Sequence, residues 1–528
     1  MHELTDTHRD ALRRVATTAV THINSIPQNT SDLDVYVVGG AVRDALLGES
    51  ANDLDFVVVG ETTDSMLARG FHDIDASSFG VLHDEQHEEW SLARTETKSG
   101  DGYKGIEVDT NDVQLRADLE RRDLRINAMA LRINTTATPT SIDDSNTTPI
   151  TGTDADSVFV DPFGGRFDIQ NGTLYHVSEA FSEDPIRVLR AARYAARYDN
   201  PVFTIATSTE RLIREVAPEL NRMSRDRIGE EVVKAMKQAV DPARFWEVLR
   251  DVGALAVIAP TLDRASIIPA GPERFHREGD TFEHTMMVLR RMHQLCESHD
   301  ITGMNRVRRY LMAVAHDLGK VELGNEKGGL WSDDPPRRFG GHATTGVDVT
   351  ANFGTRLGLD AHIIEAMEDA SRYHMDFHDI PTWDARKLIE FVEAHTAPPE
   401  AETPYMGTVE ELLDLAQADH EGRWQNIDLY DAETAYQVDA AAPDDAARPA
   451  FQRDVFESQI AVARDAIESI DGYEVLRDGL CDSHTSDTIT DDNLARVLNA
   501  CGDCRSPGEW VGDKITTRRT SLINSETT

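Results

Sequence analysis

The pattern of hydrophobic and polar positions in residues 31–133 predicts a compact α+β unit. Tyr36, Val37 and Val38 form a short β-branched and aromatic run that ends at two glycines, and helix-forming residues then continue up to Gly48. Gly48 is suited to end that helix, since glycine readily adopts the left-handed conformation found there. A second apolar run, residues 57–59, predicts another strand. The pattern therefore predicts strand, helix and strand in close succession.

Helical periodicity dominates the chain after residue 168. A helix is predicted from Glu183 onward, because Pro185 suits the first turn. At about 100° per residue its arginines share a sector of about 120°, and valine, leucine and alanine occupy the opposite side. This arginine stripe consists of Arg187, Arg190, Arg193 and Arg197. Shorter helical patterns cover residues 11–24 and 451–470.

Two carboxylates precede the strand predicted at residues 57–59. Side chains alternate along a strand, so Asp53 and Asp55 are expected on one face, about 7 Å apart. Such a pair repels unless cations lie between the carboxylates. Hard oxygen ligands of this kind suit Mg²⁺, which completes its shell with substrate phosphates. The paired glycines, Gly39 and Gly40, would let the backbone approach a triphosphate closely.

The complete string G-G-x-V-R-D-x-L-L-G-x-x-x-x-D-x-D resembles motif A of the class II tRNA nucleotidyltransferase and poly(A) polymerase family, within the polymerase-β-like superfamily. The resemblance implies that Asp53 and Asp55 are the catalytic Mg²⁺ ligands and that Gly40 and Arg43 contact the nucleotide. Residues 88–105 resemble the corresponding stretch of the bacterial multifunctional CCA proteins, which makes Arg94 a candidate triphosphate ligand.

Four more motifs follow in the order of that family. Residues 119–130 (LERRDLRINAMA) resemble motif B, and residues 161–168 resemble motif C. Residues 183–190 resemble motif D, and residues 220–231 resemble motif E, whose role is to support the motif D helix. The roles that the resemblance implies are triphosphate contact by Arg122 and Arg190, ribose recognition by Asp123, and reading of the Watson–Crick edges of C and A by Asp184 and Arg187.

A second set of chemistry-bearing residues lies within residues 261–425. An adjacent histidine–aspartate pair follows an apolar stretch, and imidazole with carboxylate suits a divalent transition metal that activates water. The order H…HD…D resembles the HD phosphohydrolase superfamily, which implies a transition metal or Mg²⁺ held by His284, His316, Asp317 and Asp419. His342 is expected near that metal. In the multifunctional CCA proteins this domain carries phosphatase and 2′,3′-cyclic phosphodiesterase activity.

The amino-acid composition indicates the environment in which the protein works. With 94 acidic and 53 basic residues the net charge is −41, and only eight of the basic residues are lysines. An acidic, lysine-poor globular protein fits a cytoplasm of high salt, so we expect a halophile. Residues 187–227 run against this trend, with nine arginines and five acids. No apolar run reaches 18 residues, no signal peptide is evident and cysteines number four, which predicts a cytoplasmic protein without a membrane partner.

These observations predict an α+β head of the polymerase-β-like kind with a mixed sheet, followed by an all-α neck and body and an all-α HD domain. We place an N-terminal helical extension at 1–30, the head at 31–168 with a polar insertion at 134–157, the neck and body at 169–260, the HD domain at 261–425 and an acidic helical tail at 426–528.

The predicted activity is stepwise addition of C, C and A from CTP and ATP to the tRNA 3′ end. A poly(A) polymerase and a CC-only or A-only transferase remain open, as does a non-catalytic RNA-binding protein. The oligomeric state is open between monomer and dimer. Cysteine and histidine spacing in the tail fits zinc in part, but nothing else there resembles a zinc ribbon, so we expect no zinc at Cys481, His484, Cys501 and Cys504.

Overall fold

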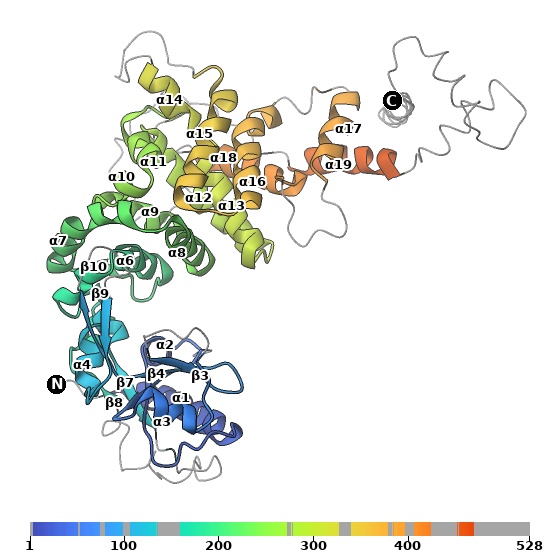
Figure 1. Cartoon of the computed structure of the whole chain (residues 1–528). Coiled ribbons are helices and arrows are strands. Elements are labelled where there is room, and N and C mark those ends of the chain that lie inside the picture. The colour runs from blue at the N-terminus through green and yellow to red at the C-terminus, as the bar shows by residue number, and fades with distance from the viewer. Residues whose placement is uncertain are drawn as a thin grey trace, which may run out of the picture. The chain divides into compact units, whose positions relative to one another are not determined.

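The computed structural model describes residues 4–50, 53–73, 80–98, 106–133, 135, 159–271, 276, 278–326, 339–378, 383, 385–396, 406–423, 451 and 453–468 (Figure 1). The chain divides into two compact units, Met1–Pro260 and Thr261–Thr528. Three sequence predictions fall wholly or largely outside the described residues: the insertion at 134–157 apart from Thr135, the tail at 426–528 apart from residues 451 and 453–468, and the four candidate zinc ligands.

A six-stranded mixed sheet forms the centre of the head. Its strand order is β3-β4-β2-β1-β7-β8, and all neighbours are antiparallel except β2 and β4. The strands are β1 (Asp34–Val38), β2 (Asp55–Val59), β3 (Val81–His83), β4 (Glu89–Leu92), β7 (Ala130–Ile133) and β8 (Phe159–Val160). A separate hairpin pairs β5 (Thr95–Lys98) with β6 (Ile106–Asp109). The mixed sheet agrees with the fold class predicted from the sequence.

The turn from β1 into α2 (Gly40–Leu47) requires glycine. Gly39 has φ of 66°, and a Cβ there would lie 3.1 Å from a guanidinium nitrogen of Arg122. Because β1 ends at this turn, Val38 is its last residue to pair, and it pairs with Asp55. Strand β2 therefore begins at Asp55, and Asp53 precedes the strand instead of lying within it. Gly48 ends α2 in the left-handed conformation, as predicted.

The N-terminal helix α1 (Asp6–Ser25) packs against α2 and β7. It begins earlier than the sequence pattern suggested, because the Thr5 hydroxyl accepts from the His8 amide and caps the helix. Buried Asp84 ties α1 to the sheet: its carboxylate lies 2.6 Å from His22 Nε2 and accepts from the Trp90 indole at 2.8 Å. The remaining elements of the head are α3 (Thr63–Ala68), α4 (Leu115–Glu120), η2 (Arg125–Asn127) and α5 (Gly165–Gln170).

Helices follow the head within the same unit (Figure 1). The arginine-bearing helix α6 packs against α8 and α9, so its alanine, valine and leucine side chains are buried. The elements that follow the head in the first unit are β9 (Thr173–Leu174), η5 (Glu179–Glu183), α6 (Ile186–Arg197), β10 (Thr204–Ile205), α7 (Thr207–Val216), η6 (Ala217–Arg222), α8 (Arg225–Gln238), α9 (Pro242–Asp251) and α10 (Leu255–Ile258). Helix α11 (Pro260–Arg264) begins at the boundary, and η7 (Ala265–Ile267) belongs to the second unit.

The described part of the second unit is helical, as predicted for an HD domain. Its elements are α12 (Thr281–Ser298), α13 (Gly303–Ala315), α14 (Gly319–Glu326), α15 (His342–Leu357), α16 (Ala361–Tyr373), η8 (Asp376–His378), α17 (Ala385–Ala394), α18 (Val409–Glu421) and α19 (Arg453–Glu468). None of the helices in the described ranges combines the length and apolarity needed to cross a bilayer.

A buried ion pair joins α13 to α18. The Arg308 guanidinium is fully buried and donates to both carboxylate oxygens of Glu411 at 2.9 Å, and to the carbonyls of His362 and Met406 at 2.6 and 2.7 Å. Without this guanidinium the buried Glu411 carboxylate would keep only the Thr408 amide at 3.0 Å and the more distant Arg309 at 3.7 Å, and would lose its main charge partner.

Arg308→Ala should therefore destabilise the second unit by about 3–5 kcal/mol and lower its melting transition by roughly 6–20 °C. Arg464→Ala removes a solvent-exposed pair with Glu410 in the same unit and serves as the matched control. Its cost should stay below about 1 kcal/mol. Differential scanning calorimetry measures both, and equal shifts for the two variants would contradict the account.

Candidate functional site

One pocket of about 850 Å³ in the first unit is lined by every residue that the sequence predicted for the transferase site. These residues come from helix α2, the start of β2 and the segment before it, the segment after β4, the α4–η2 segment, the η5–α6 segment and helix α6. They are Gly40, Arg43, Asp53, Asp55, Arg94, Arg122, Asp123, Asp184, Arg187 and Arg190. The sequence thus selected residues that lie up to 150 positions apart and that the fold brings around one cavity.

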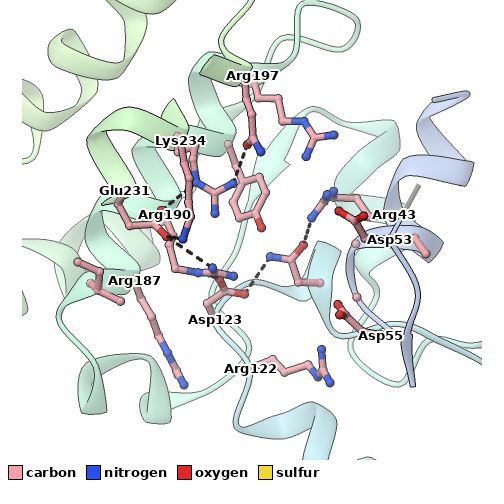
Figure 2. A pocket seen from close by; sticks show the side chains of 18 of the residues that line it. Arg43, Asp53, Asp55, Arg122, Asp123, Arg187, Arg190, Arg197, Glu231 and Lys234 are labelled. Atoms are coloured by element: carbon pink, nitrogen blue, oxygen red, sulfur yellow. Dashed lines mark hydrogen bonds and ion pairs between the residues drawn. The ribbon is translucent and has the colours of Figure 1, made fainter. Parts of the chain in front are cut away.

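Side chains of both charge signs line this pocket. Its lining contains nine arginines and one lysine against eight carboxylates. Figure 2 shows Asp53 and Asp55 entering from one side and Arg187, Arg190 and Glu231 from the other, with Asp123 between them. A cavity with this excess of guanidinium groups suits a polyanionic ligand.

The carboxylate side of the pocket consists of Asp53, Asp55 and Glu89. The surrounding protein raises the pKa of Asp55, and the negative charges of Glu89 and Asp53 raise it further, while Arg122 opposes them. Carboxylates that repel one another in this way are stabilised by a divalent cation, and Mg²⁺ needs only one or two protein carboxylates. The oxygen donors here therefore fit Mg²⁺.

A buried carboxylate orients the arginines next to that side. Asp118 accepts from Arg121 at 2.7 Å and from Arg122 at 3.3 Å, and its Oδ1 also accepts from the Arg94 amide at 3.3 Å. Although burial opposes ionisation, Arg122 and Arg121 lower the pKa of Asp118. Glu96 accepts from the side chains of Arg94 and Arg121 at 3.0 and 2.7 Å. The positions of these guanidinium groups are therefore fixed without a ligand.

A continuous polar chain, here called the central network, runs from α2 through η2 to α6 and α8. Arg43 donates to Asn127 at 2.5 Å, and the Asn127 amide donates to Asp123 at 2.9 Å. Asp123 also accepts from Arg190 at 2.7 Å, and the Arg190 guanidinium lies 4.0 Å from Glu231. Burial alone would raise the pKa of Asp123, but Arg190 and Asn127 lower it, so this carboxylate stays ionised.

The two residues expected to read the base are each held by a partner. Asp184 accepts from Arg227 at 2.7 Å, and its other oxygen accepts from the Ile186 amide at 3.2 Å. Arg187 donates to the carbonyl of Ala180 at 2.8 Å. Arg227, from the stretch that resembles motif E, thus holds one of the two residues predicted to read the base.

The arginine stripe of α6 lies against protein instead of forming a solvated basic face. Arg187 and Arg193 are buried, and Arg193 donates to Glu231 and Gln238, both at 2.9 Å. Arg197 donates to Asp44 and Glu49 in and after α2. The sequence analysis placed Arg193 and Arg197 on the stripe and residues 220–231 in motif E, but assigned none of them to the nucleotide site. The charged or aromatic lining residues that it did not assign on this side are Arg193, Tyr194, Arg197, Arg227, Glu230, Glu231 and Lys234.

Most arginines of residues 187–227 fall into two groups, one that lines the pocket and one that forms exposed ion pairs. Five of the nine arginines line the pocket. The exposed residues Arg211, Arg214 and Arg222 instead form ion pairs with nearby acids on their own helices, at 2.7 Å each. Net charge along the sequence could not separate these two groups, because the carboxylate partners of the pocket arginines come from distant segments.

The second unit brings together the four predicted HD residues, all buried. His284 Nε2 lies 3.5 Å from Asp317 and 3.1 Å from Asp419, and His316 Nε2 lies 3.2 and 4.0 Å from the same carboxylates. Within the described residues neither Nε2 atom forms a well-aligned hydrogen bond. Burial opposes ionisation, yet Lys320 lowers the pKa of Asp317 and Arg423 lowers that of Asp419. Buried nitrogens facing ionised carboxylates fit a divalent metal.

Asp317 also faces two more histidines. Its other carboxylate oxygen lies 3.3 Å from His342 Nε2 and 3.6 Å from His374 Nε2. Both rings have their Nδ1 atoms against backbone carbonyls, at 2.7 and 2.8 Å, which leaves Nε2 directed at the carboxylate. The structure therefore places His342 beside the predicted cluster, as expected, and adds His374, which the sequence analysis did not select.

Glu278 supports the first histidine of the cluster. Its Oε1 lies 2.9 Å from His284 Nδ1 and 2.8 Å from His276 Nδ1. A carboxylate on Nδ1 fixes the ring so that Nε2 faces Asp317 and Asp419. His276 and Glu278 lie immediately before α12 and escaped prediction, although their closeness to His284 in the sequence was a usable signal.

Comparison with known proteins agrees with this division of sites. Residues 35–175 match the poly A polymerase head domain, residues 202–266 match a probable RNA and SrmB-binding site of polymerase A, and residues 281–423 match the HD domain. The chain is 40% identical over 365 residues to the "Multifunctional CCA protein" of Paracidovorax citrulli (strain AAC00-1), covering 68% of this chain and 78% of the relative.

Solved structures share the fold. One, titled as a CCA-adding enzyme in an apo form, matches with a TM-score of 0.51 and 18% identity over 94% of this chain and 96% of that one. Another, a tRNA-processing enzyme complex, gives 0.50 and 16% over 97% and 100%.

The head, the helical neck and the charged pocket define a nucleotidyltransferase of the poly(A) polymerase head class, joined to an HD domain. On the identity and coverage given above, the chain belongs to the multifunctional CCA protein family.

Proposed function

We propose that the protein adds C, C and A stepwise to the 3′ end of tRNA, using CTP and ATP. The observation that carries this proposal is the convergence of all ten predicted transferase residues on one pocket, in a chain of this family. In the proposed reaction the tRNA 3′-hydroxyl attacks the α-phosphate of the nucleotide, and pyrophosphate leaves.

Asp53 and Asp55 would hold Mg²⁺, which when bound activates the attacking hydroxyl and neutralises the developing phosphate charge. Arg43, Arg94, Arg122 and Arg190 would contact the triphosphate. Asp123, ionised and buried, accepts hydrogen bonds only, and this suits a ribose hydroxyl.

Asp184 and Arg187 would select the base. The first offers only acceptors and the second only donors, so together they can pair with the exocyclic amine and ring acceptors shared by C and A. Their partners, Arg227 and the Ala180 carbonyl, hold them in place before the base arrives. RNA would be bound through its backbone and shape.

The test uses tRNA transcripts that end at the discriminator base, at C and at CC, incubated with Mg²⁺ and labelled CTP or ATP in molar KCl. Stepwise C, C, A and then a stop is expected. Asp53→Ala and Asp55→Ala should each lower the rate by about 10³-fold or more, since metal stabilisation of the transition state is worth several kcal/mol. Asp10→Ala, an exposed carboxylate on α1, is the matched control.

Other products would redirect the proposal. Continued A addition would indicate a poly(A) polymerase, and C-only or A-only products would indicate a divided activity. A folded protein that incorporates nothing at any salt would leave RNA binding or the HD site as the function.

We further propose that the HD unit is a metal-dependent phosphohydrolase acting on phosphate monoesters or 2′,3′-cyclic phosphates. The described side chains offer two clusters that share Asp317, one with His284 and His316 and one with His342 and His374. These residues, with Asp419, would hold one or two divalent ions, which when bound generate a nucleophilic hydroxide.

Glu278→Gln tests the metal site directly. Without the carboxylate on Nδ1, His284 loses its fixed orientation, and the affinity for Mn²⁺ or Ni²⁺ should fall about 10–100-fold in calorimetric titration of the metal-free protein. Hydrolysis of 2′,3′-cyclic AMP should fall with it. Glu297→Gln, on the exposed side of α12, should leave both unchanged. Unaltered metal affinity in Glu278→Gln would refute the assignment.

The composition supports a further part of the proposal, that the enzyme works in a salt-rich cytoplasm. Phosphate contacts weaken steeply with salt. Salt would weaken triphosphate binding less in a pocket with fixed guanidinium groups than on an exposed basic face, because buried charges are screened less by salt than exposed ones. We propose domain boundaries as predicted from the sequence.

A further inference from the structure

The ring of Tyr194, on helix α6, lies at the centre of the pocket arginines. Its centroid is 4.9 Å from the guanidinium carbon of Arg43, 4.6 Å from that of Arg193 and 5.9 Å from that of Arg190. The side chain lines the pocket and is only 4% exposed. All three guanidinium carbons thus lie within about 6 Å of the ring centroid, the range in which the ring quadrupole attracts a cation.

These contacts join two segments that are far apart in the sequence. Arg43 comes from α2 in the head, whereas Arg190 and Arg193 belong to α6. The central network links the same two arginines along another route, through Asn127 and Asp123. Arg43 is therefore held by Asp44 and Asn127, and Arg190 by Asp123, while both guanidinium groups also lie near the Tyr194 ring.

The direction in which the pKa of Tyr194 shifts shows that positive charge is concentrated around its hydroxyl group. Burial alone would raise the pKa of Tyr194, yet Arg190, Arg43 and Arg193 together lower it to about 8. Guanidinium groups gathered this closely repel one another in the absence of a ligand. An aromatic ring close to them offsets part of that repulsion without itself occupying a hydrogen-bond donor. Arg43 already directs Nε and Nη2 at Asp44 and Nη1 at Asn127, so its remaining N–H groups are the ones left for phosphate oxygens.

We propose that Tyr194 is a positioning residue for the triphosphate, whose aromatic ring holds Arg43 and Arg190 at a spacing that suits phosphate oxygens. This inference rests on the proposed nucleotidyl transfer and adds a determinant that acts through other side chains. It assigns the function to the ring and not to the hydroxyl group. It also predicts that the effect follows the phosphate groups of the ligand and not its base.

The test compares Tyr194→Met with Tyr194→Phe. Methionine fills a similar volume without an aromatic quadrupole, and phenylalanine keeps the ring. Binding of CTP, CMP and inorganic pyrophosphate to the full chain is measured by calorimetry with Mg²⁺ present, and folding is checked by melting temperature. Tyr175→Leu is the matched control: it removes a ring 4.6 Å from Arg125 in the same unit, at a position that does not line the pocket.

Tyr194→Met should weaken CTP and pyrophosphate about tenfold and CMP less than about twofold, because each cation–π contact in a partly desolvated site contributes about that much. Tyr194→Phe should recover most of the affinity, and the control should match the wild type. In the tRNA assay the KM for CTP should rise while kcat changes little. Should Tyr194→Met fail to fold, Tyr194→Leu answers the same question.

Three results would overturn the inference. One is unchanged pyrophosphate affinity in folded Tyr194→Met, another is an equal loss for CMP and CTP, and the third is a loss in Tyr194→Phe as large as in Tyr194→Met. Wild-type protein that binds neither CTP nor pyrophosphate would instead contradict the proposed function itself, so the two failures are distinguishable.

Discussion

The structure of the first unit depends on pairing arginines with carboxylates that lie far away in the sequence. Arg190 meets Asp123 across 67 positions, Arg193 meets Glu231 across 38, and Arg197 meets Asp44 across 153. Without these carboxylate partners, the free-energy cost of desolvating the buried guanidinium groups, together with their mutual repulsion, would exceed the stabilisation gained from packing. With them, the head and α6 are held around one cavity that still presents surplus positive charge.

The same long-range pairing explains what the sequence could and could not predict. Local order along the chain identified Asp53 and Asp55, the turn at Gly39 and Gly40, and the fold class, because these depend on short-range propensity and on motifs of adjacent residues. Helical periodicity placed the arginines of α6 on one side but could not tell a solvent face from a cavity. Tyr194 carried no such signal, since a single tyrosine in an alanine-rich helical stretch has the pattern of an ordinary core residue.

The second unit also depends on buried charge pairing, but there the central group is negative and its partners can carry positive charge. There the buried centre is a carboxylate, Asp317, and the groups around it are histidines and Lys320. The motif H…HD…D predicted its first members by their types and order. His374 became evident only in three dimensions, because a single histidine at a helix end has no distinctive spacing. Glu278 lies close to His284 in the sequence, but only the structure shows that its carboxylate meets His284 Nδ1.

The central claim is that this pocket binds a nucleoside triphosphate with its phosphates on the arginines and its base against α6. A crystal structure with CTP and Mn²⁺ tests it most directly. The account predicts an anomalous Mn²⁺ signal beside Asp53 and Asp55, phosphate oxygens on Arg43, Arg122 and Arg190, and the cytosine edge on Asp184 and Arg187. A nucleotide bound with its base away from Asp184, or with its metal away from both aspartates, would contradict it.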